Sequence, residues 1–254
     1  MSRTSTLIVA GLVVGWLSKS PQAEAAINYG DFAGDTVMYT DVTEESLTDT
    51  LPLYGAPTIS GNTLDFNPVG LGASASGGSF DFTDGQLNFG IQALGGNAIP
   101  AIHFSENGDF DLGGVGTAAT VVNVAATFFI DVVAVDGVPL SIPQLTATMS
   151  FVPGGGTMTL PAYPGIGQIW NGALGINVNQ WLTDNGVSFV TGATEIKVNL
   201  DNKLAAFSED GSVAFIAKKD FKGIGITVPE VPEPSVFAIA LVGAGLCLAR
   251  RKTQ

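Results

Sequence analysis

The sequence has only one cysteine and one histidine, and each scarcity excludes a class of site. Cys247 lies close to the C-terminus, so the rest of the chain has no thiol for a disulfide or a thiolate metal site. His103 is the only imidazole, which excludes a multi-histidine metal centre. A chain of 254 residues can still bury a core large enough to fold without disulfides.

Positive charge is also scarce. Ten Lys and Arg stand against 23 Asp and Glu, for a net charge of −13, and no Lys or Arg occurs between Lys19 and Lys197. Nucleic-acid binding needs a basic patch that displaces counterions from the phosphates. We therefore expect no nucleic-acid partner.

The N-terminal segment has the order of features of a secretory signal peptide. Arg3 precedes an apolar stretch at 7–17, and Ala23 and Ala25 are the small residues of a cleavage site. We predict a signal peptide over residues 1–25, cleaved after Ala25. The alternative is an uncleaved N-terminal anchor.

The C-terminal segment pairs a short apolar run with a basic cluster. As a helix, residues 236–249 would be about 21 Å long, which is shorter than the roughly 30 Å of membrane hydrocarbon. The residues that follow are Arg250, Arg251 and Lys252. Basic clusters of this kind stay cytoplasmic, so this predicted membrane helix places the preceding chain on the far side of the membrane.

A proline-containing motif precedes this run. Its residues are Pro232, Glu233, Pro234 and Ser235, and the prolines favour an extended backbone. The motif, the apolar run and the basic end, in this order, resemble the PEP-CTERM sorting signal of bacterial exported proteins. The resemblance implies recognition of residues 229–254 by an exosortase-type membrane enzyme, cleavage near the motif, and release or transfer to the cell surface. An ordinary tail anchor is the alternative.

The intervening residues, 26–228, show the two-residue period of half-buried strands. Apolar and polar residues alternate over 86–94 and 144–152, and 118–135 is rich in β-branched residues. Residues 194–228 are interpreted as a four-strand meander with turns at 201–203 and 209–212.

The remaining stretches complete the predicted domain. Residues 176–185 have the spacing of one short helix, with Asn177 as its cap. The glycine-rich stretches 70–78 and 153–156 are interpreted as loops. Together these patterns predict a single antiparallel β-sandwich, jelly-roll-like, with one short helix. Stretches at 29–44, 81–87 and 213–221 also resemble a recurring type of PEP-CTERM protein, which implies no activity.

Few residues suggest chemistry. We interpret His103 as a solvated strand residue, and no nucleophile-elbow motif supports a Ser-His-Asp triad. Asp109 and Asp111 share one side of a strand and are candidate calcium ligands, with solvated acidic residues as the alternative. Asp81 and Asp84 are expected to flank a turn.

The chain is therefore predicted to be an exported, non-catalytic cell-surface or extracellular-matrix protein. The alternative is a carbohydrate-binding module for matrix polysaccharide, and a glycan-active enzyme with paired carboxylates is a weaker one. The tyrosines are candidate sugar-stacking residues, but core packing is the commoner role of such residues. They are Tyr29, Tyr39, Tyr54 and Tyr163.

Overall fold

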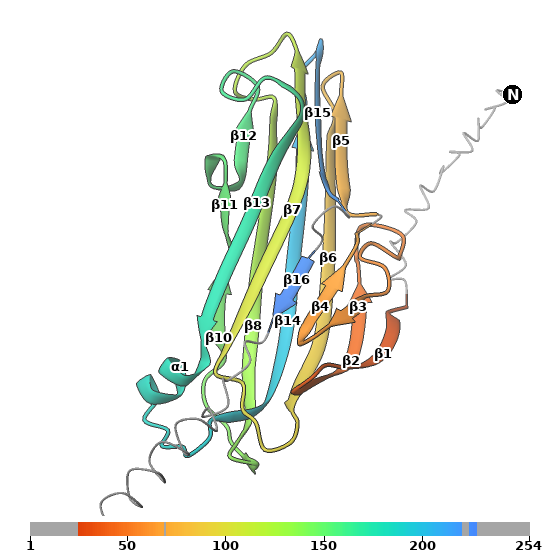
Figure 1. Cartoon of the computed structure of the whole chain (residues 1–254). Helices are drawn as coiled ribbons and strands as arrows, with labels where there is room; N and C mark the ends of the chain where they lie inside the picture. The colour runs from red at the N-terminus through yellow and green to blue at the C-terminus, as the bar shows by residue number, and fades with distance from the viewer. Residues whose placement is uncertain (1–24, 69, 220–223, 228–254) are drawn as a thin grey trace, which may run out of the picture.

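The structure, a computed structural model, describes residues 25–68, 70–219 and 224–227, and these form two antiparallel sheets (Figure 1). Sheet A contains, in spatial order, β1 (Ile27–Ala33), β2 (Val37–Glu45), β6 (Phe80–Ala93), β14 (Ala193–Phe207), β8 (Val121–Val135) and β10 (Leu145–Thr148); the short β9 (Val138–Pro139) and β12 (Thr157–Thr159) also pair with β8. Sheet B contains β11 (Ser150–Val152), β13 (Gly165–Asn177), β7 (Ala101–Gly114), β16 (Ile224–Thr227), β4 (Thr63–Phe66) and β3 (Thr58–Ser60); β15 (Ser212–Lys218) pairs with β7 and with β5 (Gly72–Ser76). A 3-10 turn, η1 (Gly154–Gly156), and one helix, α1 (Val178–Asp184), complete the described elements.

The two sheets pack face to face around one apolar core. The ring centroids of Phe104 on β7 and Phe128 on β8 lie 4.2 Å apart across this interface. The buried residues of both sheets form a single cluster. The all-β sandwich expected from the sequence is therefore confirmed for the described residues.

The long strands follow the predicted alternation but extend further than expected. Leu87, Phe89 and Ile91 are buried, as the period of two predicts. The same alternation continues back to Phe80, so the turn expected at Asp81 and Asp84 is wrong, because both residues lie within β6.

The turn expected at 201–203 is also wrong, because β14 runs straight through it. Asn202 is fully buried in this strand, and its amide is bonded to other buried polar side chains. A polar triplet resembles a turn in sequence, but here only the central residue faces the core.

The four-strand meander is likewise corrected. A turn does form at 209–212, where the Ser212 amide donates to the Glu209 carbonyl at 3.0 Å and Gly211 has a φ of +79°. However, this turn joins β14 in sheet A to β15 in sheet B, so the two strands share no ladder.

A similar change of sheet splits the strand expected at 144–152. Residues before the buried Met149 pair with β8 in sheet A, and residues after it pair with β13 in sheet B. The alternation is preserved through the crossing, so the sequence pattern alone does not reveal it.

The helix prediction is confirmed, whereas one loop prediction is not. The Asn177 side chain caps α1 by accepting a hydrogen bond from the Gln180 amide at 2.9 Å. The glycine-rich stretch 70–78 contains β5, which pairs with β15. Its small side chains leave no strong strand pattern in the sequence.

Candidate functional site

The outer face of sheet A carries a row of polar residues along its three longest strands. In the strand registers, Asn199 on β14 lies between Asn88 on β6 and Phe129 on β8. The Asn199 amide donates to the Asn88 side-chain oxygen. All three side chains are half-buried, because neighbouring outward side chains stand around them.

A depression of about 700 Å³ lies on this face. Its lining includes the side chains of Asp31, Thr40, Asp41, Thr43, Asn88, Gln92, Phe129, Asp131, Glu195, Lys197 and Asn199, whereas Phe89, which also borders it, is buried in the core. We call these residues the outer groove. Amides, hydroxyls and the Phe129 ring thus share a lining with more carboxylates than ammonium groups.

The edge hairpin of β1 and β2 shapes one side of the outer groove. A bulge in β2 lies between Thr40 and Thr43, where Asp41 has a φ of +51°. The Asp41 amide donates to the Asp31 carboxylate at 2.9 Å. A Cβ at Gly90 would collide with the Thr40 hydroxyl, so glycine at this position lets that hydroxyl lie against β6.

The opposite side of the groove is formed by β8 and β14. Lys197 stands opposite Asp131 in the register, and the Asp131 carboxylate accepts a hydrogen bond from Gln144 at 3.0 Å. The other lining carboxylates, on β1, β2 and β14, leave the groove acidic. Such a groove repels anionic ligands and accepts neutral or cationic ones.

A close acidic pair lies further along the same face, at Asp84 and Asp201. The Lys203 ammonium contacts Asp201 at 2.6 Å. One carboxylate oxygen of each acid is shielded from solvent and has no hydrogen-bond donor. Burial, and then the neighbouring Asp201, raise the pKa of Asp84. Asp84 therefore holds its proton more readily than an exposed aspartate does.

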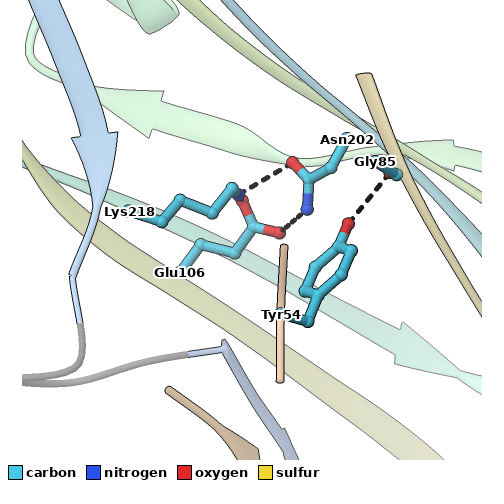
Figure 2. Close-up of polar contacts among 5 residues, drawn as sticks. All are labelled: Tyr54, Gly85, Glu106, Asn202 and Lys218. Atoms are coloured by element: carbon cyan, nitrogen blue, oxygen red, sulfur yellow. Dashed lines mark hydrogen bonds and ion pairs between the residues drawn. The ribbon is translucent and has the colours of Figure 1, made fainter. Parts of the chain in front are cut away.

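A second polar cluster is buried inside the sandwich, and Figure 2 shows its polar contacts. Lys218 on β15 forms an ion pair with Glu106 on β7 and donates to the Asn202 oxygen at 2.8 Å. The Asn202 amide donates to Glu106 at 2.5 Å, which links sheet B to sheet A. We call these three residues the buried trio.

The surroundings of the buried trio are aromatic. The Lys218 ammonium lies 5.3 Å from the centre of the Trp170 ring, and the nearby Tyr54 hydroxyl donates to the Gly85 carbonyl at 2.9 Å. Burial lowers the pKa of Lys218, and the Glu106 carboxylate opposes that shift. The side chains of the ion pair are at most 1% exposed, so a polymeric ligand cannot reach the trio. Its role is to stabilise the fold.

The two predicted calcium ligands have different partners in the structure. Phe110 and Leu112 are buried, so Asp109 and Asp111 share the outer side of β7, as expected. Asp109 lies 3.5 Å from the Lys219 ammonium, whereas Asp111 accepts a hydrogen bond from the Gly167 amide at 2.6 Å. Within residues 25–68, 70–219 and 224–227, no group of three or more acidic, His or Cys side chains is arranged to hold a metal ion. Calcium binding stays a prediction.

The histidine and the tyrosines singled out from the sequence lie in different environments. His103 is exposed on β7, which confirms its interpretation. Tyr39 and Tyr54 are fully buried core residues, and Tyr29 and Tyr163 are partly buried against the core. The tyrosines therefore belong to the core and its margin.

The sorting residues lie outside the described part of the chain. This holds for Ala23, for Pro232, Glu233, Pro234 and Ser235, and for Arg250, Arg251 and Lys252. Ala25 is described and is exposed two residues before β1. The helix in the described ranges is too short to cross a membrane.

Sequence reasoning missed the buried trio and the outer groove for different reasons. For the trio, in each case the polar residue occupies a position at which the alternation of the strand predicts an inward side chain. These residues are Glu106, Asn202 and Lys218, and the sequence alone could have shown this. The groove depends on which strands lie side by side, and no single stretch of sequence reports that.

Comparison with protein-family profiles and with curated proteins gives no match. Among solved structures, the family 11 xylanase from Neocallimastix patriciarum is 11% identical, with 81% of this chain and 99% of that chain covered and a TM-score of 0.23. A loop-swap mutant of Xyn11A from the same organism is 10% identical, with 78% and 94% covered and a TM-score of 0.21. The VP2 subviral particle of infectious bursal disease virus is 12% identical, with 85% and 59% covered and a TM-score of 0.21. With TM-scores this low, these likenesses carry no argument about what the chain does.

Proposed function

We propose that this chain is an exported, non-catalytic cell-surface or extracellular-matrix protein that is sorted through residues 229–254. The proposal rests on the order of the proline motif, the apolar run and the basic end. The boundaries of the sandwich are compatible with it. The first described strand begins at Ile27, after the predicted cleavage site, and the last described strand ends at Thr227, before the motif. Both cuts would leave every described strand in the mature protein.

Intact-mass measurement of the mature protein tests the sorting proposal. We expect a mass that corresponds to a start at residue 26 and an end near Pro232. The same measurement on cells that lack the exosortase-type enzyme should show the start unchanged and the end uncut. A folded body inside the cytoplasm with both ends intact would exclude export.

The outer groove favours a second role for the body, the binding of matrix polysaccharide. Sugar hydroxyls donate to carboxylates and accept from amides, and an aromatic ring packs against the apolar side of a sugar. Asn88, Asn199, Asp131 and Phe129 supply these groups together. The acidic lining favours a neutral polysaccharide over an anionic one.

Affinity electrophoresis in gels containing dextran, xylan, hydroxyethyl cellulose or alginate tests this role. We expect retardation by at least one of the neutral polymers, none by alginate, and loss of retardation in Phe129→Ala. The matched control is His103→Ala, an exposed change on the outer face of the other sheet. Equal mobility in every gel would exclude polysaccharide binding.

The same polymers separate binding from hydrolysis. A non-catalytic protein releases no reducing ends on prolonged incubation with any of them. If a polymer is degraded and Asp84→Asn or Asp201→Asn abolishes the turnover, the body is a glycan-active enzyme and the acidic pair is its site.

A further inference from the structure

A row of three phenylalanines, two of them exposed and Phe82 half-buried, lies on the outer face of sheet A, away from the groove. Phe80 is 62% exposed and Phe207 is 39% exposed. They face each other in the register of β6 and β14. The rings of Phe80 and Phe82 are stacked, with centroids 6.5 Å apart and planes 12° apart. We call these residues the phenylalanine row.

The outward direction of the row follows from its neighbours. Thr83 and Leu204 on the alternate phase are fully buried, and the Thr83 hydroxyl donates to the Gly72 carbonyl of sheet B at 2.7 Å. The row therefore takes no part in the core between the sheets. Large exposed aromatic groups in one patch are a feature of binding surfaces.

The row and the outer groove lie on the same two strands. Along the ladder of β6 and β14, the pair Phe80 and Phe207 is followed by Asp84 with Lys203, then by Asn88 with Asn199. From residue 80 to residue 90 the strand extends roughly 33 Å at 3.3 Å per residue. One linear ligand that lies along these strands can therefore touch both.

The chemistry of this face limits the ligand. It must present apolar surfaces to the row and hydrogen-bonding groups to the groove, which excludes a purely apolar partner. It must also tolerate the acidic pair and the acidic groove, which excludes an anionic polymer or an anionic lipid surface. An uncharged polysaccharide meets all of these requirements, since each sugar ring has an apolar face and a polar rim.

We propose that the phenylalanine row is a second subsite for the polysaccharide that the outer groove binds, so that one uncharged chain lies along β6 and β14 and stacks its far sugars on Phe80, Phe82 and Phe207. This inference rests on the proposed polysaccharide binding. It adds that affinity depends on ligand length. A chain that reaches from the groove to the row gains contacts that a short fragment does not.

Calorimetric titration of the double variant Phe80→Ala/Phe207→Ala tests the inference, with the neutral polymer that retards the wild type and with a short oligosaccharide of it. We expect the polymer to bind about tenfold more weakly to the double variant, because two stacked rings are lost. The oligosaccharide should bind both proteins equally. The matched control Phe80→Tyr/Phe207→Tyr keeps the rings and should keep the polymer affinity. Equal melting temperatures of all forms exclude misfolding.

Two results would overturn the inference while leaving the groove in place. The first is unchanged polymer binding by the double variant under conditions in which Phe129→Ala abolishes it. The second is a wild-type dimer in light scattering that becomes monomeric in the double variant, which would make the row a contact between copies of the chain. If no neutral polymer binds the wild type, the groove proposal itself fails and the subsite with it.

Discussion

The ammonium of Lys218 and the carboxylate of Glu106 form an ion pair that is enclosed between the two sheets. The next residue, Lys219, is exposed and lies 3.5 Å from Asp109 on the outer face of sheet B. Two consecutive lysines therefore meet opposite environments, because successive side chains of an extended chain point to opposite faces. This pair of neighbours provides an internal comparison of a buried and an exposed charge.

Replacing Lys218 with Met should strongly destabilise the fold. The change leaves the Glu106 carboxylate buried without its partner, which costs about 3–5 kcal/mol of unfolding free energy. Urea denaturation followed by tryptophan fluorescence measures the loss. The matched control Lys219→Met should change stability by less than about 0.5 kcal/mol. Similar losses in the two variants would show that the buried pair has no special role.

The double replacement Glu106→Leu/Lys218→Met should cost less than either single replacement. Removing both charges leaves no uncompensated ion in the core, although Asn202 then loses two partners. The same denaturation experiment gives the coupling between the two residues. If the double variant loses as much unfolding free energy as the two single variants lose together, a direct ion-pair interaction would be contradicted.

Replacing Asp84 with Asn should change how stability depends on pH. Because burial and Asp201 raise the pKa of Asp84, the folded protein holds this proton at a pH where the unfolded chain releases it. The stabilisation from this group is therefore complete in acid and is lost as the pH rises through the folded pKa. The amide of the Asp84→Asn variant mimics the protonated acid, so the variant should gain melting temperature relative to wild type at neutral pH and not in acid.

The charged groups around Asp84 define the control for this experiment. Asp201 and Asp49 oppose ionisation of Asp84, and Lys203 favours it. The control Glu45→Gln removes one exposed carboxylate from the neighbouring strand β2, outside the acidic pair. A melting temperature for Asp84→Asn that runs parallel to wild type over the whole pH range would count against a raised pKa of Asp84.

Neutralising Arg250, Arg251 and Lys252 should impair membrane retention and processing, because the basic cluster is expected to hold the apolar run at the inner surface. Cell fractionation and intact mass measure the two effects. The charge-conserving variant Arg250→Lys/Arg251→Lys/Lys252→Arg should behave like the wild type. Unchanged processing of the neutral variant would remove the support for sorting.

Calcium is expected to raise the melting temperature modestly if Asp109 and Asp111 hold the ion. Since the Lys219 ammonium lies beside Asp109, Lys219→Met should enlarge the calcium effect by removing a competing cation. Melting curves with calcium and with a chelator measure the difference in both proteins. Identical curves in all four conditions would exclude this site.

The sequence predicted elements whose causes are local. The α1 helix was predicted from the Asn177 cap, and the buried face of β6 from its alternation. The turn wrongly placed at Asn202 came from reading a polar residue as exposed, although it occupies the inward phase between Leu200 and Leu204. The inward position of Asn202 could be read from the sequence, whereas its hydrogen-bond partners on β7 and β15 could not.

The candidate site was harder to predict from the sequence than the fold was. The outer groove joins residues of β1, β2, β6, β8 and β14, which are far apart in sequence. The order of strands in a sheet depends on long-range packing, and Met149 shows that one alternating run can serve two sheets. Phe80 and Phe207 were only weakly indicated as surface residues by the sequence. Each is an apolar residue on the side of its strand that otherwise carries mostly polar residues.

The buried trio also has a consequence for how the strands align. Sliding β14 by two residues along its neighbours would keep every inward-facing side chain on the inner face, because the pattern repeats every second residue. The slide would nevertheless bring Leu200 or Leu204, in place of Asn202, against the buried charges. Apolar burial alone tolerates several such alignments, whereas a single amide matched to a single ion pair penalises all but one of them.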